Sequence, residues 1–279
     1  MSGARRVALL VAYRGDAFQG FQRQPGFRTV QEELESAWSA VTGESAVVHG
    51  SGRTDSGVHG WGQVVHLSTF HDLPLAKVRP ALNAWLPPEL AVRAAVEPGP
   101  GFHARASAIA KHYVYRLATG PVRPVLLRGL VAWERTPPDL AAMRAAAPHL
   151  VGRRDWSAMA AAGRTTKTSV RTVRALHVMP ARGGLVFHVR GEGFLYRQVR
   201  NMVGTLLEVG RGRRAPEWVG HVVASGDRKR AGATAPAEGL CLWRVHYAED
   251  PFAGVPGAAS RLYPLAAGAP NRPPRDPAS

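Results

Sequence analysis

The sequence predicts an α+β protein with two mixed α/β halves whose sheets are largely antiparallel. One observation is an order of strand, helix, loop and strand near the N-terminus that returns after about residue 105. The other is that the segments between apolar runs are too uneven for repeated βαβ units, which favours hairpins with helices packed on one face. A chain of 279 residues is long enough for two well-buried cores.

In the first half, the apolar residues 7–13 predict a buried strand. Residues 29–41 carry apolar side chains at helical spacing. After a glycine-rich break, residues 63–70 predict another strand with Val65 and Leu67 on one face. In the second half we expect strands over 111–117, 172–179 and 184–189, the last two forming a hairpin, and helices over 140–150 and 194–209.

Proline and glycine mark the expected boundaries. Pro87-Pro88 and the stretch 97–101 indicate the crossing between the halves. We therefore predict an N-terminal half over 1–105 and a C-terminal half over 106–249. Residues 250–279 are rich in proline and poor in large apolar residues, so this tail is predicted to be disordered.

The charge points to a polyanionic partner. Lysine and arginine outnumber the acidic residues 36 to 20, giving a net charge of +16, and nucleic acid is the natural partner. Coding bias towards arginine is the alternative, but bias alone does not produce this surplus. A lone Cys241 excludes an internal disulfide. With no apolar run of membrane-spanning length and no signal-like start, we expect a cytoplasmic protein without membrane contact.

The stretch 50–60 is the most informative segment. Arg53 and Asp55 lie among glycines and small polar residues, which let a backbone approach a ligand closely. Neither a Walker-type loop nor a dinucleotide fingerprint fits, and a carboxylate would repel a phosphate. The alternative is a tight turn in which Asp55 pairs with Arg53 or caps a neighbouring segment.

Two further segments carry candidate side chains. In the helix over 194–209, we expect Arg197, Asn201 and Glu208 opposite the buried face and Arg200 at its border. There Arg200 can reach a carboxylate or phosphate, or simply extend along the surface. In the strand over 111–117, Lys111, Tyr113 and Tyr115 share one face. A tyrosine there serves either as a stacking platform or as a packed core residue.

Histidines 49, 59, 66 and 71 suggest a metal site, but their spacing supports none, so we expect no bound metal. The basic clusters 211–214 and 228–230 are candidates for phosphate contacts, with solvated surface charge as the alternative.

Several motifs together resemble a known family, the TruA-type tRNA pseudouridine synthases. Gly52-Arg53-Thr54-Asp55-Ser56-Gly57-Val58-His59 is similar to their catalytic motif. Further stretches agree in order and approximate spacing, including 20–24, 102–105, 111–115, 198–204 and 233–240. The resemblance covers roughly residues 7 to 247, whereas 150–175 match only loosely.

The resemblance implies the pseudouridine synthase fold, with a basic cleft between the halves, and a homodimer that binds tRNA. The implied reaction isomerises uridine to pseudouridine in the anticodon stem-loop, at the positions conventionally numbered 38, 39 and 40, without a cofactor. By matching, Asp55 is the catalytic aspartate, Arg53 enters the helix space that the target leaves, Tyr113 lies against the base and Arg200 pairs with the aspartate. Lys111, Arg105 and Asn201 fall in the matching motifs and are expected to bind substrate.

The residue types suit this chemistry. Isomerisation breaks the bond from ribose C1′ to N1 of the base and rejoins the base through C5. An ionised carboxylate either attacks the substrate or removes a proton from C2′, and the sequence does not choose between these routes. Two other functions remain open: a catalytically silent tRNA-binding or tRNA-folding protein, and a hydrolase that releases free uracil. Departures from the family at Arg14-Gly15-Asp16, Phe21 and Ser56 affect a local turn and leave the proposed catalytic set intact.

Overall fold

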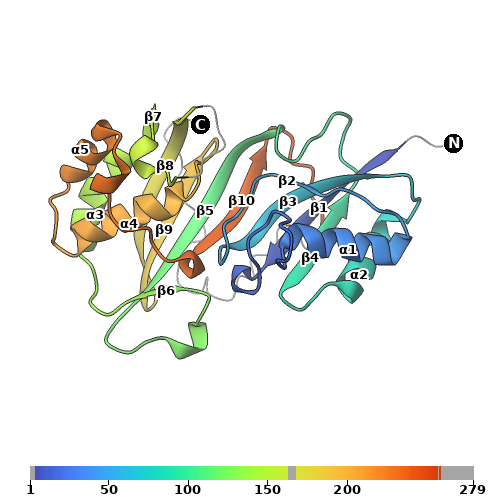
Figure 1. Ribbon diagram of the computed structural model, residues 1–279, viewed down its shortest axis with the longest axis horizontal. Helices are drawn as coiled ribbons and strands as arrows, with labels where there is room; N and C mark the ends of the chain where they lie inside the picture. Colours follow the sequence, from blue (N-terminus) through green and yellow to red (C-terminus); the bar gives the residue numbers. More distant parts are fainter. Residues whose placement is uncertain (1–3, 163–167, 257, 259–279) are drawn as a thin grey trace. The chain divides into compact units, whose positions relative to one another are not determined.

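A computed structural model describes residues 4–162, 168–256 and 258 (Figure 1). The chain forms two compact units. Of the described residues, the first unit comprises 4–112, 241–256 and 258, and the second comprises 113–162 and 168–240. Both units combine helices with strands that pair mostly in antiparallel fashion, which confirms the α+β prediction.

The first unit holds a sheet in the order β4-β1-β3-β10, with β2 also paired to β3. Its strands are β1 (Arg5–Tyr13), β2 (His49–Gly50), β3 (His59–Thr69), β4 (Leu90–Val96) and β10 (Leu240–Tyr247, which enters this unit at Cys241). β1 runs antiparallel to both β3 and β4, while β10 runs parallel to β3. The expected strands over 7–13 and 63–70 are confirmed, whereas β4 and β10 were not predicted.

Helices α1 (Val30–Thr42) and α2 (Leu75–Trp85) pack in the same core as this sheet (Figure 1). α1 follows the predicted spacing, with the Thr29 side chain accepting a hydrogen bond from the Glu32 amide at its N-terminus. The core cluster includes Val7, Leu9 and Val11 of β1, Val65 and Leu67 of β3, and Leu34 and Trp38 of α1. Burial of these side chains supplies the main stabilisation of the unit, at about 25 cal/mol per Å² of apolar surface.

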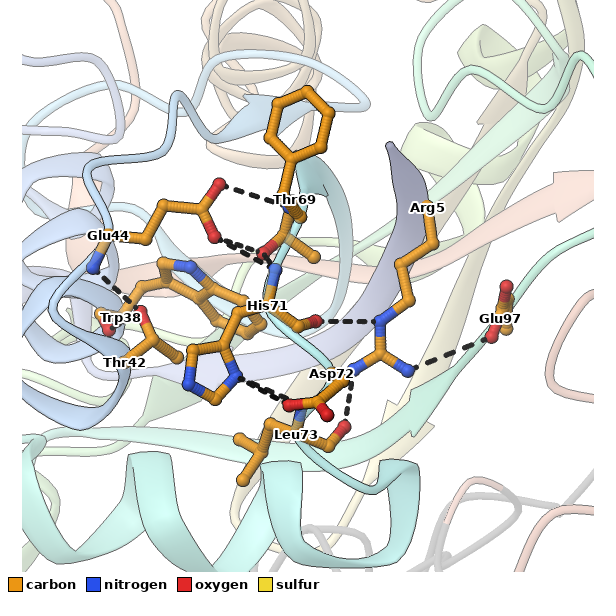
Figure 2. A network of polar contacts seen from close by, with 10 residues as sticks. Arg5, Trp38, Thr42, Glu44, Thr69, His71, Asp72, Leu73 and Glu97 are labelled. Carbon is orange, nitrogen blue, oxygen red and sulfur yellow. Dashed lines mark hydrogen bonds and ion pairs between the residues drawn. The ribbon is translucent and has the colours of Figure 1, made fainter. Parts of the chain in front are cut away.

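A polar network joins the start of β1 to the segment that follows β3 (Figure 2). The Glu44 carboxylate accepts hydrogen bonds from the Thr69 hydroxyl at 2.5 Å and from the backbone amides of Phe70 and His71 at 3.1 and 3.2 Å. These bonds, led by that of Thr69, lower the pKa of Glu44. Arg5 donates from Nε to the His71 carbonyl at 3.1 Å. The network therefore ties the end of β3 to β1 and to the segment after α1.

The second unit holds a sheet in the order β5-β9-β8-β7, with β6 also paired to β5. Its strands are β5 (Ala108–Thr119, which enters this unit at Tyr113), β6 (Ala132–Glu134), β7 (Gly152–Asp155), β8 (Val170–Ala181) and β9 (Gly184–Gly191). β8 and β9 form the predicted hairpin. The helices are α3 (Leu140–Ala146), α4 (Gln198–Gly210) and α5 (Trp218–Ser225).

The division of the chain differs from our prediction in two ways. The chain passes between the units at His112 and Tyr113, inside β5, and not near residue 105. It also returns to the first unit at β10. The proline-rich stretches mark turns within the first unit instead, because Pro87 precedes β4 and residues 97–101 follow it. A continuous strand can cross a boundary between compact units without a loop, so loop composition did not reveal it.

Three helices and the tail also differ from the sequence-based predictions. α2 was not predicted because Pro80 lies inside it and proline interrupts a helical pattern. α5 was missed as well. α4 begins at Gln198 and not at 194, because Arg197 adopts a left-handed conformation with φ of 59°. Of the predicted tail, residues 250–256 form turns with Phe252 buried; residues 257 and 259–279 lie outside the described residues.

Candidate active site

The loop between β2 and β3, residues 51–58, carries Asp55 and is held by hydrogen bonds within the first unit. Gln63 of β3 is fully buried. Its carbonyl oxygen accepts from the Ser51 hydroxyl at 2.6 Å, and its amide nitrogen donates to the Gly52 carbonyl at 2.9 Å. The Ser51 amide donates to the Val64 carbonyl at 2.8 Å. One buried side chain thus fixes the start of the loop.

The middle of the loop is held by β1. The Tyr13 hydroxyl and the Thr54 hydroxyl are 2.9 Å apart, and both residues are buried. Burial raises the pKa of Tyr13, so its phenol stays protonated. The Thr54 carbonyl accepts from the Phe21 amide at 3.1 Å. Thr54 is therefore fixed on both sides directly before Asp55.

The end of the loop rests on a turn after β1. The Gly15 amide donates to Nδ1 of the buried His59 at 3.0 Å, and the Gly57 amide donates to the Gly15 carbonyl at 3.2 Å. Gly20 has a φ of +89°, and a β-carbon there would lie 2.9 Å from the Thr54 carbonyl oxygen, so only glycine fits. His59 thus has a structural role in this motif. The departure at 14–16 forms a local ion pair, with Arg14 and Asp16 2.6 Å apart.

At the apex, Asp55 is half-buried and Arg53 is exposed. The Asp55 carbonyl accepts from the Val58 amide at 3.1 Å, which closes a turn while leaving the carboxylate to other contacts. The loop thus presents a carboxylate and a guanidinium from a backbone that hydrogen bonds hold in place. This is the arrangement that pre-organised catalysis requires.

Lys111 of β5 lies directly against this loop. A β-carbon placed on Gly52 would lie 2.6 Å from the Lys111 ammonium nitrogen. Burial, with a smaller contribution from the charge of Arg105, lowers the pKa of Lys111 to about 8. Lys111 is therefore a cation close to neutral pH, and it loses its charge as the pH rises through that value.

The other expected catalytic residues, Tyr113 and Arg200, belong to the second unit. Tyr113 is buried and packs edge-on against Phe194, with ring centroids 5.4 Å apart. Sequence reasoning did not identify Phe194, whose position just before α4 gave no signal. Tyr115, on the same face of β5, is a packed core residue against Phe187.

Arg200 is positioned by a segment that crosses α4. Its Nε donates to the Ala235 carbonyl at 2.8 Å, and the Ala235 amide donates back to the Arg200 carbonyl at 3.1 Å. This approach depends on Gly204, since a β-carbon there would lie 1.7 Å from the Ala233 carbonyl oxygen. The stretch 233–240, which the sequence associated with the family, thus holds the arginine. Its pairing with Asp55 stays a prediction.

Asn201 is fully buried, so our placement of it on the exposed side of the helix was wrong. Its amide nitrogen donates to the Met159 carbonyl at 2.8 Å, and its oxygen accepts from Arg228 at 3.0 Å and from Thr234 at 2.7 Å. The residues that cover it, Met159 and the segment after α5, come from distant parts of the chain, which helical periodicity does not reveal. These contacts give Asn201 a structural role.

The basic clusters are largely engaged within the second unit. Arg228 donates to the Gly232 carbonyl at 2.9 Å in addition to Asn201, and burial lowers its pKa. Arg211 and Arg213 pair with Glu208 at 2.8 and 3.2 Å. These contacts favour a structural interpretation over phosphate binding for these three arginines. Among the described residues, no group of three histidine, cysteine or acidic side chains is arranged to hold a metal.

The chain is related to known proteins over most of its length. A family model described as tRNA pseudouridine synthase matches residues 9–105 and 146–248. These segments contain Asp55 and Arg200, while Lys111 and Tyr113 lie between them. The class of protein is thus a pseudouridine synthase, and the chain belongs to the tRNA pseudouridine synthase family.

Individual relatives extend over nearly the whole chain. The chain is 46% identical over 242 residues to a tRNA pseudouridine synthase A from Syntrophotalea carbinolica, covering 87% of this chain and 96% of that protein. It is 44% identical over 259 residues to a protein of the same name from Shouchella clausii, covering 91% and 98%. Among solved structures, a Cbf5-Nop10-Gar1 complex aligns at 16% identity with a TM-score of 0.28, covering 72% of this chain and 54% of that chain, which is too low to add to the fold assignment.

Proposed function

We propose that this protein converts uridine to pseudouridine in the anticodon stem-loop of tRNA, at the positions conventionally numbered 38, 39 and 40. The observation that carries the proposal is the Asp55 loop, fixed by Gln63, Tyr13 and His59 in a chain that belongs to the tRNA pseudouridine synthase family. No helix among the described residues is long and apolar enough to cross a membrane. We further propose a cytoplasmic homodimer.

Asp55 is the proposed catalytic carboxylate. In its ionised form it either attacks the substrate or takes a proton from C2′, and both routes release the base from C1′ for rotation and reattachment through C5. Arg200 is proposed to lie beside it, keep it charged and orient it, because a guanidinium favours the ionised form of a neighbouring carboxyl. The hydrogen bond that Nε donates to the Ala235 carbonyl would set the orientation of that guanidinium.

A base within a stem must leave the stack before it can react, which costs a few kcal/mol. Arg53 is exposed at the loop apex, in keeping with a side chain that enters the space left by the target nucleotide. Tyr113 is proposed to stack on the extruded base, with Phe194 holding its ring. Lys111 and Arg105 are proposed to contact phosphates near the loop. Lys111 lies against Gly52, and the charge of Arg105 is close enough to lower the pKa of Lys111.

The test is to incubate the purified protein with unmodified tRNA and to map modified nucleosides by position. Pseudouridine at 38, 39 or 40 supports the proposal in full, and pseudouridine elsewhere retains the activity but refutes the target. Tight binding without product would favour a silent tRNA-binding or tRNA-folding protein. Free uracil would show a hydrolase. The matched control is Asp72→Asn, since Asp72 is exposed at the far end of β3 and its loss should leave turnover unchanged.

A further inference from the structure

Three histidines of the first unit come together beside the Asp55 loop. His49 of β2 stacks on His66 of β3 with ring centroids 5.0 Å apart, and His103 lies 4.6 Å from His66 and 6.0 Å from His49. Val65 and Leu67 face the core beneath α1 and α2, so His66 lies on the opposite face of the sheet. The cluster therefore lies on the face that these helices leave uncovered.

The hydrogen bonds fix which ring nitrogens carry protons. Nδ1 of His103 accepts from the backbone amides of Arg105 and Ala106 at 3.1 and 3.2 Å. Nδ1 of His66 accepts from the Ala104 amide at 3.2 Å. A ring whose Nδ1 accepts in this way carries its proton on Nε2 in its neutral form. His66 is buried and also bonds the His49 backbone, whereas His49 is exposed and His103 is half-buried.

The charged groups that act on His66 are basic. Burial, followed by the nearby basic groups His103, Arg6 and His49, lowers the pKa of His66 to about 4, so this ring stays neutral. Arg105 follows His103 in the chain and acts in turn on Lys111, which lies against Gly52. None of the described groups that shift His66 or Lys111 is acidic. We call His49, His103, Arg105 and Lys111 the basic track.

Basic groups gathered in this way repel one another whenever they are charged, and a bound anion offsets that repulsion. Among the described residues, these histidines are not arranged as a metal-holding group. We propose that His49 and His103 bind a backbone phosphate of the RNA substrate. This inference rests on the proposed function, since it takes the RNA as the anion, and it assigns the two imidazoles a contact beyond those of Arg105 and Lys111.

The experiment measures the affinity for unmodified tRNA across a salt series, at pH 6 and at pH 8, for the wild type, His49→Gln and His49→Lys. A free imidazole gains positive charge as the pH falls from 8 to 6. Each phosphate that a cation neutralises adds about 0.7 to 0.9 to the magnitude of the slope of log K against log salt. His49 is the residue to vary because it is exposed and its replacement does not disturb the core.

We expect His49→Gln to weaken binding about five-fold at pH 6 and to lower the salt slope by nearly one, with a smaller effect at pH 8. His49→Lys should restore the slope at both pH values. Lys77→Gln removes an exposed charge from α2, on the other face of the sheet, and should change the slope little.

An unchanged slope and affinity in His49→Gln, in protein that still forms pseudouridine, would overturn the inference while leaving the proposed function intact. An equal loss at both pH values that lysine fails to restore would also overturn it, because a structural defect would then explain the effect. Failure of the proposed function would show separately, as absence of pseudouridine in the wild type.

Discussion

The two units hold their proposed catalytic groups in different ways. In the first unit, buried polar side chains do most to fix the Asp55 loop, with Gln63, Tyr13 and His59 each bonded to it or to its supporting turn, and the close contact at Gly20 adds to these bonds. In the second unit, close packing at Gly204 brings a crossing segment onto α4, and a backbone carbonyl holds Arg200. A hydrogen-bonded loop can weaken gradually as bonds are removed, whereas a glycine contact tolerates almost no change. The following predictions test this difference.

The largest effect is expected at Gly204. Although alanine favours a helix over glycine by about 1 kcal/mol, the added carbon of Gly204→Ala would lie 1.7 Å from the Ala233 carbonyl oxygen. The segment 231–236 must then move, and we expect a loss of stability of about 3 kcal/mol together with most of the activity. Urea unfolding and pseudouridine formation measure the two losses.

The matched control is Gly193→Ala, where the nearest atom to the added carbon is 3.9 Å away. This variant should retain wild-type stability. Full stability and activity in Gly204→Ala would show that the packing on α4 does not hold Arg200.

A smaller effect is expected at Gln63. Gln63→Leu leaves the Ser51 hydroxyl and the Gly52 carbonyl without their partner, which costs about 2 to 3 kcal/mol of stability. The loop start loosens, so kcat should fall at least ten-fold while tRNA affinity changes little. Gln63→Glu puts a carboxylate oxygen against the Gly52 carbonyl in this fully buried site, so a loss at least as large is expected. A wild-type kcat in both variants would remove Gln63 from the account.

Lys111 predicts a pH dependence with opposite signs for stability and for binding. Its pKa falls from 10.5 to about 8 in the folded protein, so the unfolded chain binds more protons between these values. Stability should therefore rise with pH from about 8 to 10.5, while tRNA affinity should fall as the ammonium loses its charge.

Urea midpoints and dissociation constants measured from pH 7 to pH 10 check both trends. Lys111→Met should flatten the pH dependence of both stability and affinity. Lys77 is an exposed residue of α2, so Lys77→Met should leave both dependences as in the wild type. If Lys111→Met retains the full pH dependence of both quantities, other groups cause it.

The smallest effect is expected at Tyr13. Tyr13→Phe removes one buried hydrogen bond to Thr54 and should cost about 1 kcal/mol of stability, with a few-fold loss of activity. In a double-mutant cycle with Thr54→Val, the second change should add less than it does alone, because both report the same bond. Additive losses would mean that this bond does not fix the loop.

The sequence predicted the elements whose pattern is local. The strands β1 and β3, the helix α1 and the hairpin β8–β9 follow from apolar periodicity and turn residues. The Asp55 loop was found from its glycines and its charged pair. Each of these signals lies within a few residues of the chain, where the physical cause also lies.

The rest depends on contacts between distant segments. The residues next to Asn201 in the sequence do not indicate that Met159, Arg228 and Thr234 enclose it. Gln63 supports the Asp55 loop only because β2 and β3 pair, and Ala235 meets Arg200 only because Gly204 lacks a side chain. The crossing between units inside β5 is hidden in the same way, because a strand keeps its alternation across the boundary.

The role of Asp55 is tested by comparing the wild type with Asp55→Asn in a single-turnover assay of tritium release from C5 of labelled uridine in tRNA. We expect Asp55→Asn to bind the tRNA with an affinity within about three-fold of the wild type and to release tritium at least about a thousand times more slowly, because an amide neither attacks nor accepts a proton as a carboxylate does. Tritium release at the wild-type rate by Asp55→Asn would contradict this role.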